Sequence, residues 1–152
     1  MVALNERVTR GAEIVAIARS WIGTPYRHQC SVRYQGADCL GLLRGVWREV
    51  VGAEPVDLPC YTADWSEVGR KERLWMGARD HLVEVTSAMP GDVLLFRMHR
   101  RAVAKHLAIQ AVSPQKLPTI IHAYSGRGVV ETPLTHAWRR RVVAAFAFPV
   151  KG

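Results

Sequence analysis

The sequence predicts an α+β fold in which N-terminal helices pack on one side of a C-terminal antiparallel sheet. Apolar residues recur at helical spacing before Pro90 and Gly91, whereas after this pair they gather in short segments rich in β-branched and aromatic residues. Helices followed by strands are typical of the α+β class. Because the chain has 152 residues and contains neither a repeat nor a linker-like tract, we expect one domain over residues 1–152.

The first predicted helix covers residues 9–22. Its apolar residues follow an i, i+3, i+4, i+7 pattern, which is typical of an amphipathic helix. They are Ile14, Ile17, Ala18, Trp21 and Ile22. Gly23 and Pro25 end the helical pattern. The polar residues 24–37 then predict an ordered loop.

A second helix is predicted to start at Asp38, because aspartate is a favoured N-cap residue. The face that follows from Cys39 contains Leu43, Val46, Trp47 and Val50. Cys39 therefore shares a face with the residues expected in the core. Gly41 and Gly45 lie four residues apart, so we expect this helix to approach a neighbouring element closely.

A third helix is predicted over residues 64–83, after a loop over residues 51–61 that contains glycine and two prolines. Its expected buried positions are Val68, Leu74, Trp75, Ala78 and Leu82.

Five short segments after residue 90 predict antiparallel strands: DVLLFRM, HLAIQAV, TIIHAY, GVVE and VVAAFAF. Turn-like segments such as SPQKLP and SGRG separate them. The segment PLTHAWRRR, which precedes the last strand, predicts a short basic helix or a turn.

Composition excludes several classes of protein. Hydrophobic residues make up 49% and charged residues 22% of the chain, which is typical of globular domains and not of disordered ones. The longest apolar run, over residues 142–150, is shorter than the roughly 20 residues that a membrane helix needs, so we expect no membrane span. The early charges of Glu6, Arg7 and Arg10 argue against a secretory signal peptide. We therefore expect synthesis in the cytoplasm and, for any action outside the cell, another carrier.

Positive charge is concentrated in the C-terminal third. Residues 97–152 hold ten Lys and Arg and one acid, Glu131, whereas residues 1–96 hold eleven basic and twelve acidic residues. This distribution favours an anionic partner, and it is equally typical of a solvated arginine-rich surface. Since no basic motif is interleaved with aromatic residues, we expect no nucleic-acid partner.

The cysteines are Cys30, Cys39 and Cys60. An odd number without CxxC spacing predicts neither a disulfide framework nor a cysteine-rich zinc site. With no second closely spaced pair of ligands, His28 and Cys30 are interpreted as loop residues and no metal site is expected.

Cys39 is the candidate nucleophile. It occupies the first turn of its predicted helix, where unpaired amides and the helix dipole can lower a cysteine pKa from about 8.5 toward neutral. A cysteine on an apolar helix face is also typical of a small core residue, so position alone leaves both interpretations open.

His106 and His122 differ from the other histidines because each lies within a predicted strand. His106 alternates with Ala108 on one face, and His122 shares a face with Tyr124. If the two strands are adjacent, both imidazoles can project toward the start of the Cys39 helix. The alternative is a pair of hydrogen-bonded sheet histidines. Thiol–imidazole catalysis requires a nucleophile, a base and a residue that orients the base, and this trio supplies all of them.

Five segments, in order, resemble the successive motifs of the NlpC-type cell-wall cysteine peptidases, a papain-like family: GTPYRHQ, ADCLGLLRGVW, PGDVLLFRM, KHLAIQ and IIHAYSGRGVVE. The resemblance extends over about residues 16–149. LPCYTADWSE and HAWRRRVVAAFAFP further resemble the phage-tail and gene-transfer-agent branch. The resemblance implies a papain-like arrangement of the α+β fold.

The resemblance also assigns roles by position. It implies that Cys39 is the nucleophile, His106 the general base and His122 the residue that orients His106. Tyr26 matches the tyrosine whose hydroxyl lies near the oxyanion site, and the Cys39 amide is the natural second donor. No metal or organic cofactor is implied.

Three further residues are candidates for substrate contacts. Asp38 is expected to cap the helix and is also a candidate for meeting an amine of the substrate. Ser125 and Arg127 follow His122 in a turn, and an arginine there would suit a carboxylate-bearing peptide. Many family members have a small serine after the nucleophile where this chain has Leu40, which changes the wall beside the thiol.

The implied activity is a peptidoglycan endopeptidase that cuts stem peptides at the bond between D-γ-glutamate and a diamino acid. A phage tail or gene-transfer-agent particle, with its other tail proteins as partners, would carry it into the periplasm or cell wall. Two alternatives stay open. The same Cys-His-His site serves amidases and acyltransferases that act on other N-acyl compounds, and the domain can also be a non-catalytic subunit of a tail tip.

Overall fold

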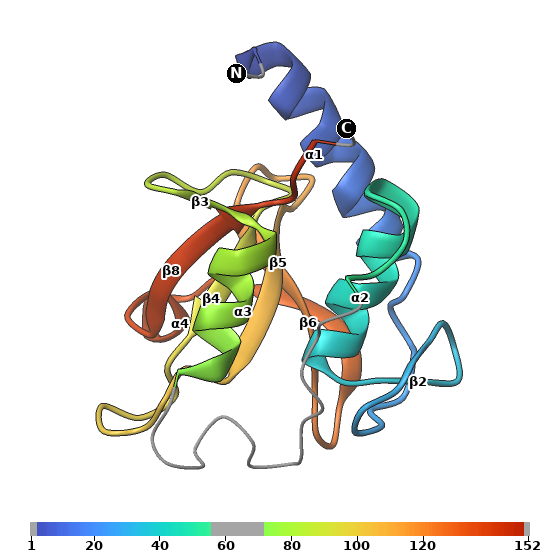
Figure 1. Ribbon diagram of the computed structural model, residues 1–152, viewed down its shortest axis with the longest axis vertical. Helices are drawn as coiled ribbons and strands as arrows, with labels where there is room; N and C mark the ends of the chain where they lie inside the picture. Colours follow the sequence, from blue (N-terminus) through green and yellow to red (C-terminus); the bar gives the residue numbers. More distant parts are fainter. Residues whose placement is uncertain (1–2, 56–71, 151–152) are drawn as a thin grey trace.

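The structure is a computed structural model that describes residues 3–55 and 72–150. Its elements in chain order are α1 (Leu4–Arg19), β1 (Ser31–Val32), β2 (Gly36–Ala37), α2 (Cys39–Val50), α3 (Arg73–His81), β3 (Val83–Val85), β4 (Val93–Phe96), β5 (His106–Val112), β6 (Pro118–Tyr124), β7 (Gly128–Pro133), α4 (His136–Arg139) and β8 (Val142–Ala147). Figure 1 shows the three longer helices beside the sheet.

The main sheet has six strands in the order β3-β8-β4-β5-β6-β7. Every neighbouring pair in it is antiparallel. This architecture confirms the predicted α+β class, and each of the five segments predicted as strands contributes one strand to the sheet. β5 and β6, which carry the two candidate histidines, are direct neighbours.

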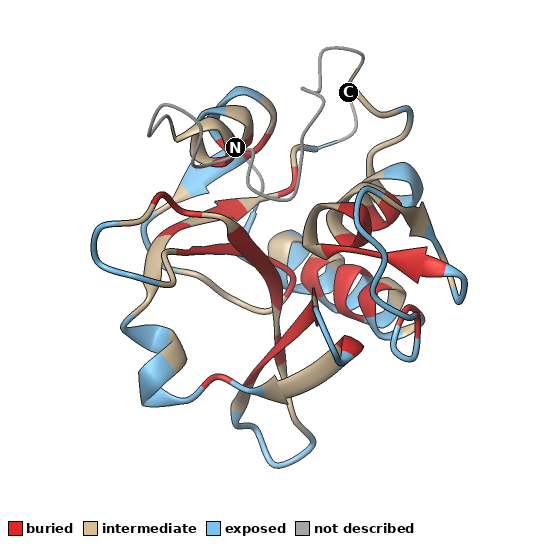
Figure 2. Cartoon of the chain, turned by 90° about the horizontal axis from the view of Figure 1, so that it is seen from below, coloured by how far each residue is buried: buried red, intermediate tan, exposed pale blue. Residues whose placement is uncertain are grey.

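Each face of the sheet has its own apolar layer. The larger one combines Ile14 of α1, Leu42 of α2 and Leu74 of α3 with β5 side chains such as Leu107. The smaller one is built around Phe96 and includes residues beside α4. Figure 2 shows buried residues along the strands and on the helix faces that turn toward them. The three longer helices therefore share one face of the sheet, as predicted.

The two glycines of α2 permit the close approach that their spacing predicts. A Cβ atom on Gly41 would lie 1.8 Å from the carbonyl oxygen of Cys30, and one on Gly45 would lie 2.0 Å from Cζ2 of Trp21. No side chain fits at such distances without movement of its neighbours. α2 is therefore packed tightly against both the preceding loop and the end of the first helical region.

Helix boundaries differ from the prediction. The first helix begins at Leu4 and ends at Arg19, since its exposed N-terminal turn lacks the apolar pattern that reveals the rest. The third helix ends at His81, and Val83 instead pairs with Ala147 in the sheet. The predicted start of that helix and Val68 lie outside the described residues. The two-residue strands β1 and β2 lie within the predicted loop, and they are too short to leave an alternating pattern.

Cys30 and Cys39 are free thiols, and Cys60 lies outside the described residues. Within residues 3–55 and 72–150, none of the helices is long and apolar enough to cross a membrane.

Candidate active site

Cys39 is the first residue of α2, and Asp38 caps that helix as the sequence predicts. The Gly41 amide donates to Oδ1 of Asp38 at 2.7 Å. The Gln29 amide donates to Oδ2 at 2.7 Å, and Nδ1 of His28 lies 3.7 Å from the same oxygen. Asp38 is 3% exposed, so its carboxylate joins the start of α2 to the preceding loop. A role toward a substrate amine stays a prediction.

The Cys39 thiol lies against the beginning of β5. It donates to the carbonyl oxygen of Lys105 at 3.8 Å. Burial raises the pKa of the Cys39 thiol to about 12, the nearby Asp38 carboxylate raises it further, and the amides of Leu107, Leu40 and Cys39 itself oppose the change. The expected lowering of the pKa by the helix N-terminus is therefore wrong for this arrangement, because desolvation of a thiolate outweighs the amide dipoles.

His106 and His122 are brought together by the pairing of β5 with β6. Nε2 of His106 lies 2.8 Å from Nδ1 of His122. On the other side of His122, Nε2 lies 3.0 Å from Oγ1 of Thr132 in β7. Both histidines are buried, with exposed fractions of 9% and 0%. Three adjacent strands thus contribute to one continuous chain of hydrogen bonds.

Burial determines the charge of this pair. It lowers the pKa of His106 to about 3, with the nearby His122 adding to the effect, and lowers the pKa of His122 to about 4. Both rings are therefore neutral at pH 7. A neutral imidazole carries one proton, so each ring has one nitrogen that donates and one that accepts.

An aromatic frame surrounds the two imidazoles. The ring centroid of Trp138 in α4 lies 5.5 Å from that of His106 and 5.2 Å from that of His122. Phe96 lies 5.2 Å from Trp138 and 5.7 Å from His106. Trp138 thereby covers both imidazoles on their side of the sheet. Sequence reasoning did not assign this role to Trp138, and the only signal for it is an aromatic residue in an otherwise basic segment.

The thiol and the imidazoles do not meet in this arrangement. Lys105 and Leu107, which flank His106, provide the backbone groups near the Cys39 sulfur. The His106 ring lies beside His122, whereas the backbone groups that contact the sulfur lie at the edge of β5, in the plane of the sheet. Between the described residues Cys39 and His106 there is no thiol–imidazole hydrogen bond. The structure therefore pairs the two histidines as expected, and their approach to the Cys39 thiol stays a prediction.

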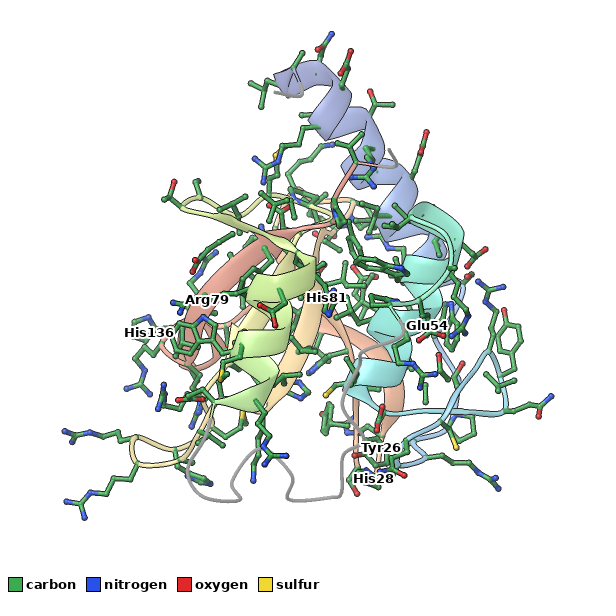
Figure 3. All side chains as sticks on the ribbon, in the orientation of Figure 1. Tyr26, His28, Glu54, Arg79, His81 and His136 are labelled. Atoms are coloured by element: carbon green, nitrogen blue, oxygen red, sulfur yellow. The ribbon has the colours of Figure 1, made fainter. Side chains whose placement is uncertain are left out.

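Tyr26 lies close to the start of α2. A parallel bridge joins it to Ala37, immediately before the N-cap residue. Partial burial, the Cys39 thiolate and the Asp38 carboxylate all raise the pKa of the Tyr26 phenol. Figure 3 shows Tyr26 and His28 close together on the loop that precedes α2. The phenol thus stays protonated and able to donate a hydrogen bond near the sulfur.

Ser125 and Arg127 are exposed in the turn between β6 and β7. That turn is held against the Tyr26 loop, because the Val129 amide donates to the Thr24 carbonyl at 2.9 Å. Gly128 has a φ of +75°, and a Cβ atom there would lie 2.5 Å from the Thr24 oxygen. The two candidate substrate residues are therefore next to the loop that carries Tyr26, and their contacts with a substrate stay a prediction.

The described residues contain no group of three His, Cys, Asp or Glu side chains arranged to hold a metal ion. What the site does hold is a partly buried cysteine, a neutral imidazole pair and amide donors at a helix N-terminus. Groups of these kinds can serve in general as a nucleophile, a base with its orienting partner, and oxyanion donors.

The fold is α+β with a papain-like arrangement of helices and sheet. A solved structure from Staphylococcus aureus, described as similar to a lipoprotein of the NLP/P60 family, matches 95% of this chain with a TM-score of 0.59 and 19% sequence identity. The match shows a shared fold. The chain spans 42% of that protein's length. No family model matches the sequence, and no curated protein does so either.

Proposed function

We propose that the protein is a cysteine peptidase of the bacterial cell wall, with Cys39 as the nucleophile. The observation that carries this proposal is the position of the Cys39 thiol, at the N-terminus of α2 and against the first residues of the strand that bears His106. The fold shared with an NLP/P60 protein supports a wall-directed activity. His106 is the proposed base and His122 the residue that orients it.

Catalysis requires one local movement. Rotation of the Cys39 side chain would bring the sulfur from the Lys105 carbonyl to Nδ1 of His106, whose Nε2 keeps its contact with His122. Hydrogen bonds of this kind often tighten only when substrate binds. The chain of hydrogen bonds to His122 and Thr132 would then hold the ring in its working orientation.

The chemical steps follow from thiol–imidazole pairs in general. The Cys39 proton passes to Nδ1 of His106 as the sulfur attacks the scissile carbonyl carbon. The negative charge on the carbonyl oxygen is stabilised by the Cys39 amide and the Tyr26 hydroxyl, donors of a kind worth about 3 kcal/mol each. The C–N bond breaks, the amine leaves with the proton from His106, and a thioester remains. Water, deprotonated by His106, hydrolyses the thioester and restores the thiol.

The proposed substrate is a peptidoglycan stem peptide, cut between D-γ-glutamate and a diamino acid. Such a peptide carries free carboxylates and amines. Arg127 and Ser125, exposed beside the Tyr26 loop, are the proposed carboxylate contacts, and Asp38 is the proposed amine contact. Carriage on a phage-tail or gene-transfer-agent particle, with action in the periplasm or cell wall, completes the proposal and rests on the sequence motifs.

A second candidate function is a non-catalytic subunit of a tail tip. One observation favours it, namely a buried thiol with a pKa of about 12 that makes no hydrogen bond to the described His106. An amidase or acyltransferase acting on another N-acyl compound would use the same residues as the peptidase, and a substrate screen separates those two activities.

Digestion of purified peptidoglycan and of a synthetic γ-D-glutamyl-diaminopimelate stem peptide, with products identified by mass spectrometry, tests the proposal. We expect cleavage by the wild type and none by Cys39→Ala, while Cys30→Ala, which removes the other described free thiol, stays active. If folded wild type cleaves neither substrate, the peptidase proposal fails and the structural subunit replaces it.

A further inference from the structure

A basic hollow lies between the β4–β5 connection and the start of β8, outside the candidate active site. Its volume is about 260 Å³. It is lined by four arginines, one histidine and two apolar residues, namely Arg97, Arg100, Arg140, Arg141, His99, Met98 and Val143. Two segments about 40 residues apart in the sequence thus place guanidinium groups around one space.

Two of the four guanidinium groups are fixed in place. Arg97 donates to the Ala102 carbonyl at 2.8 Å and to Glu72 at 2.9 Å. Arg141 donates to the Ala137 carbonyl at 2.9 Å and to the Met98 carbonyl at 3.4 Å. Each keeps N–H groups that these bonds do not use. The walls of the hollow are therefore organised before any ligand arrives, which lowers the entropy cost of binding.

Arg100 and Arg140 are exposed at the edge of the hollow. Among the described residues, neither has a carboxylate within ion-pair distance, and Glu72 is the one acid that pairs with a lining arginine. Glu131, the single acid after residue 96, instead binds Arg19 on another side of the molecule. Like charges held close together repel one another, and an anion placed between them removes that repulsion.

We propose that the basic hollow binds a phosphate group of a flexible anionic polymer. Arginine forks match phosphate oxygens and can bind two of them at once. The space is large enough for one phosphate with its attached polyol or sugar, and the exposed Arg100 and Arg140 reach the neighbouring phosphates. The lining residues contain no Phe, Tyr or Trp ring on which a base could stack, since Trp138 packs on the two imidazoles and the one ring of the lining is the imidazole of His99. This favours a phosphodiester polymer without bases over a nucleic acid.

The hollow is connected to the candidate active site through short segments of chain. Arg97 directly follows Phe96, and Arg140 is two residues after Trp138. Both aromatic residues contact His106. A polymer bound in the hollow would therefore lie next to the segments that carry the aromatic residues beside the imidazole pair. The binding proposal does not depend on Cys39 chemistry and stands or falls separately from the peptidase.

The test compares two double variants of the full chain in a Cys39→Ala background, which removes any turnover. Arg100→Gln with Arg140→Gln removes two charges from the hollow, and Arg27→Gln with Lys116→Gln removes two exposed charges elsewhere. The probes are poly(glycerol phosphate), inorganic polyphosphate and a DNA duplex, titrated between 50 and 200 mM salt. Circular dichroism and thermal unfolding verify that each variant folds.

We expect the hollow variant to bind poly(glycerol phosphate) about 10-fold more weakly, and its slope of log K against log salt to fall in magnitude by about 1.4, the value for two lost phosphate contacts of a flexible chain. The Arg27 and Lys116 control should change affinity less than 3-fold. If both variants lose affinity equally, binding depends on the overall positive charge of the protein and not on the hollow, and the proposal is overturned. Tighter binding of DNA than of either base-free polymer would also overturn it, in favour of a nucleic-acid partner.

Discussion

Nε2 of His106 and Nδ1 of His122 lie 2.8 Å apart, and this contact joins two neighbouring strands through their side chains. Two arrangements of protons satisfy it. If His106 donates from Nε2, its Nδ1 is free to accept a proton, and His122 then donates from Nε2 to Thr132. In the reverse arrangement Nδ1 of His106 carries the proton and the ring cannot act as a base. Thr132 is the last member of this chain and thus a positioning residue in the proposed mechanism.

Replacing Thr132 by valine should lower kcat on the stem peptide by about 5- to 100-fold with little change in KM. The substitution leaves the buried Nε2 of His122 without a partner, which costs about 1–3 kcal/mol. The loss is greatest for the tautomer in which Nε2 of His122 carries the proton, because a buried N–H is then left unpaired, and that is the tautomer in which His106 is a base. Thr132→Ser keeps the hydroxyl and should restore activity to within about 3-fold.

Nitrogen NMR of the imidazoles checks the same prediction independently of turnover, because it reports which nitrogen carries the proton. We expect the His106 signal to shift toward a mixture of tautomers in Thr132→Val and to be unchanged in Thr132→Ser. Unchanged spectra and activity in Thr132→Val would remove Thr132 from the mechanism.

The buried histidines should make the folded state sensitive to acid. Burial lowers the folded-state pKa of His106 to about 3 and of His122 to about 4, whereas an unfolded histidine titrates near 6.5. Between these values the unfolded chain binds more protons, so stability is lost as pH falls below about 6.5. We expect the pair to reduce the free energy of unfolding by about 2–4 kcal/mol from pH 7 to pH 5, as measured by urea denaturation.

His122→Gln provides the comparison for this pH effect. Glutamine does not titrate, so the variant should lose about half of the pH dependence between pH 7 and pH 5, whatever its stability at pH 7. His136→Gln, at an exposed position on α4, provides the matched substitution outside the buried pair. If the wild type and both variants show the same change of unfolding free energy between pH 7 and pH 5, the buried pair does not control the pH dependence.

The Cys39 thiol should be slow to react in the absence of substrate. With a pKa of about 12, its thiolate fraction rises about tenfold per pH unit from pH 7 to pH 10, and the rate of alkylation by iodoacetamide should rise in parallel. Peptide mass spectrometry distinguishes alkylation of Cys39 from alkylation of Cys30 and Cys60. If the alkylation rate is instead already constant with pH below pH 7, Cys39 is a thiolate paired with an imidazolium in the free protein. The arrangement of the Cys39 thiol in solution would then differ from the one described above.

The parts that sequence predicted best are those governed by local chemistry. The alternation of residues 106–112 predicted β5, and the aspartate before Cys39 predicted the N-cap of α2. The pairing of His106 with His122 followed from adjacency of their strands. The contact of the thiol with the backbone of β5 did not, because it depends on how the start of α2 packs against the edge of that strand. The contribution of Thr132 was missed for a similar reason, since a threonine in an edge strand carries no signal until its cross-strand neighbour is known.

The contact of Gly45 with Trp21 predicts a destabilising substitution with a matched control. A Cβ atom on Gly45 would lie 2.0 Å from Cζ2 of the buried Trp21, so Gly45→Ala must displace the indole or α2 and should cost about 1–3 kcal/mol of unfolding free energy. Gly77 lies within α3, and a Cβ atom there would meet no atom within 4 Å. Gly77→Ala should therefore stabilise by up to about 1 kcal/mol through helix propensity alone. Chemical denaturation at pH 7 measures both, and equal effects of the two substitutions would mean that α2 does not pack on Trp21 as closely as the structure shows.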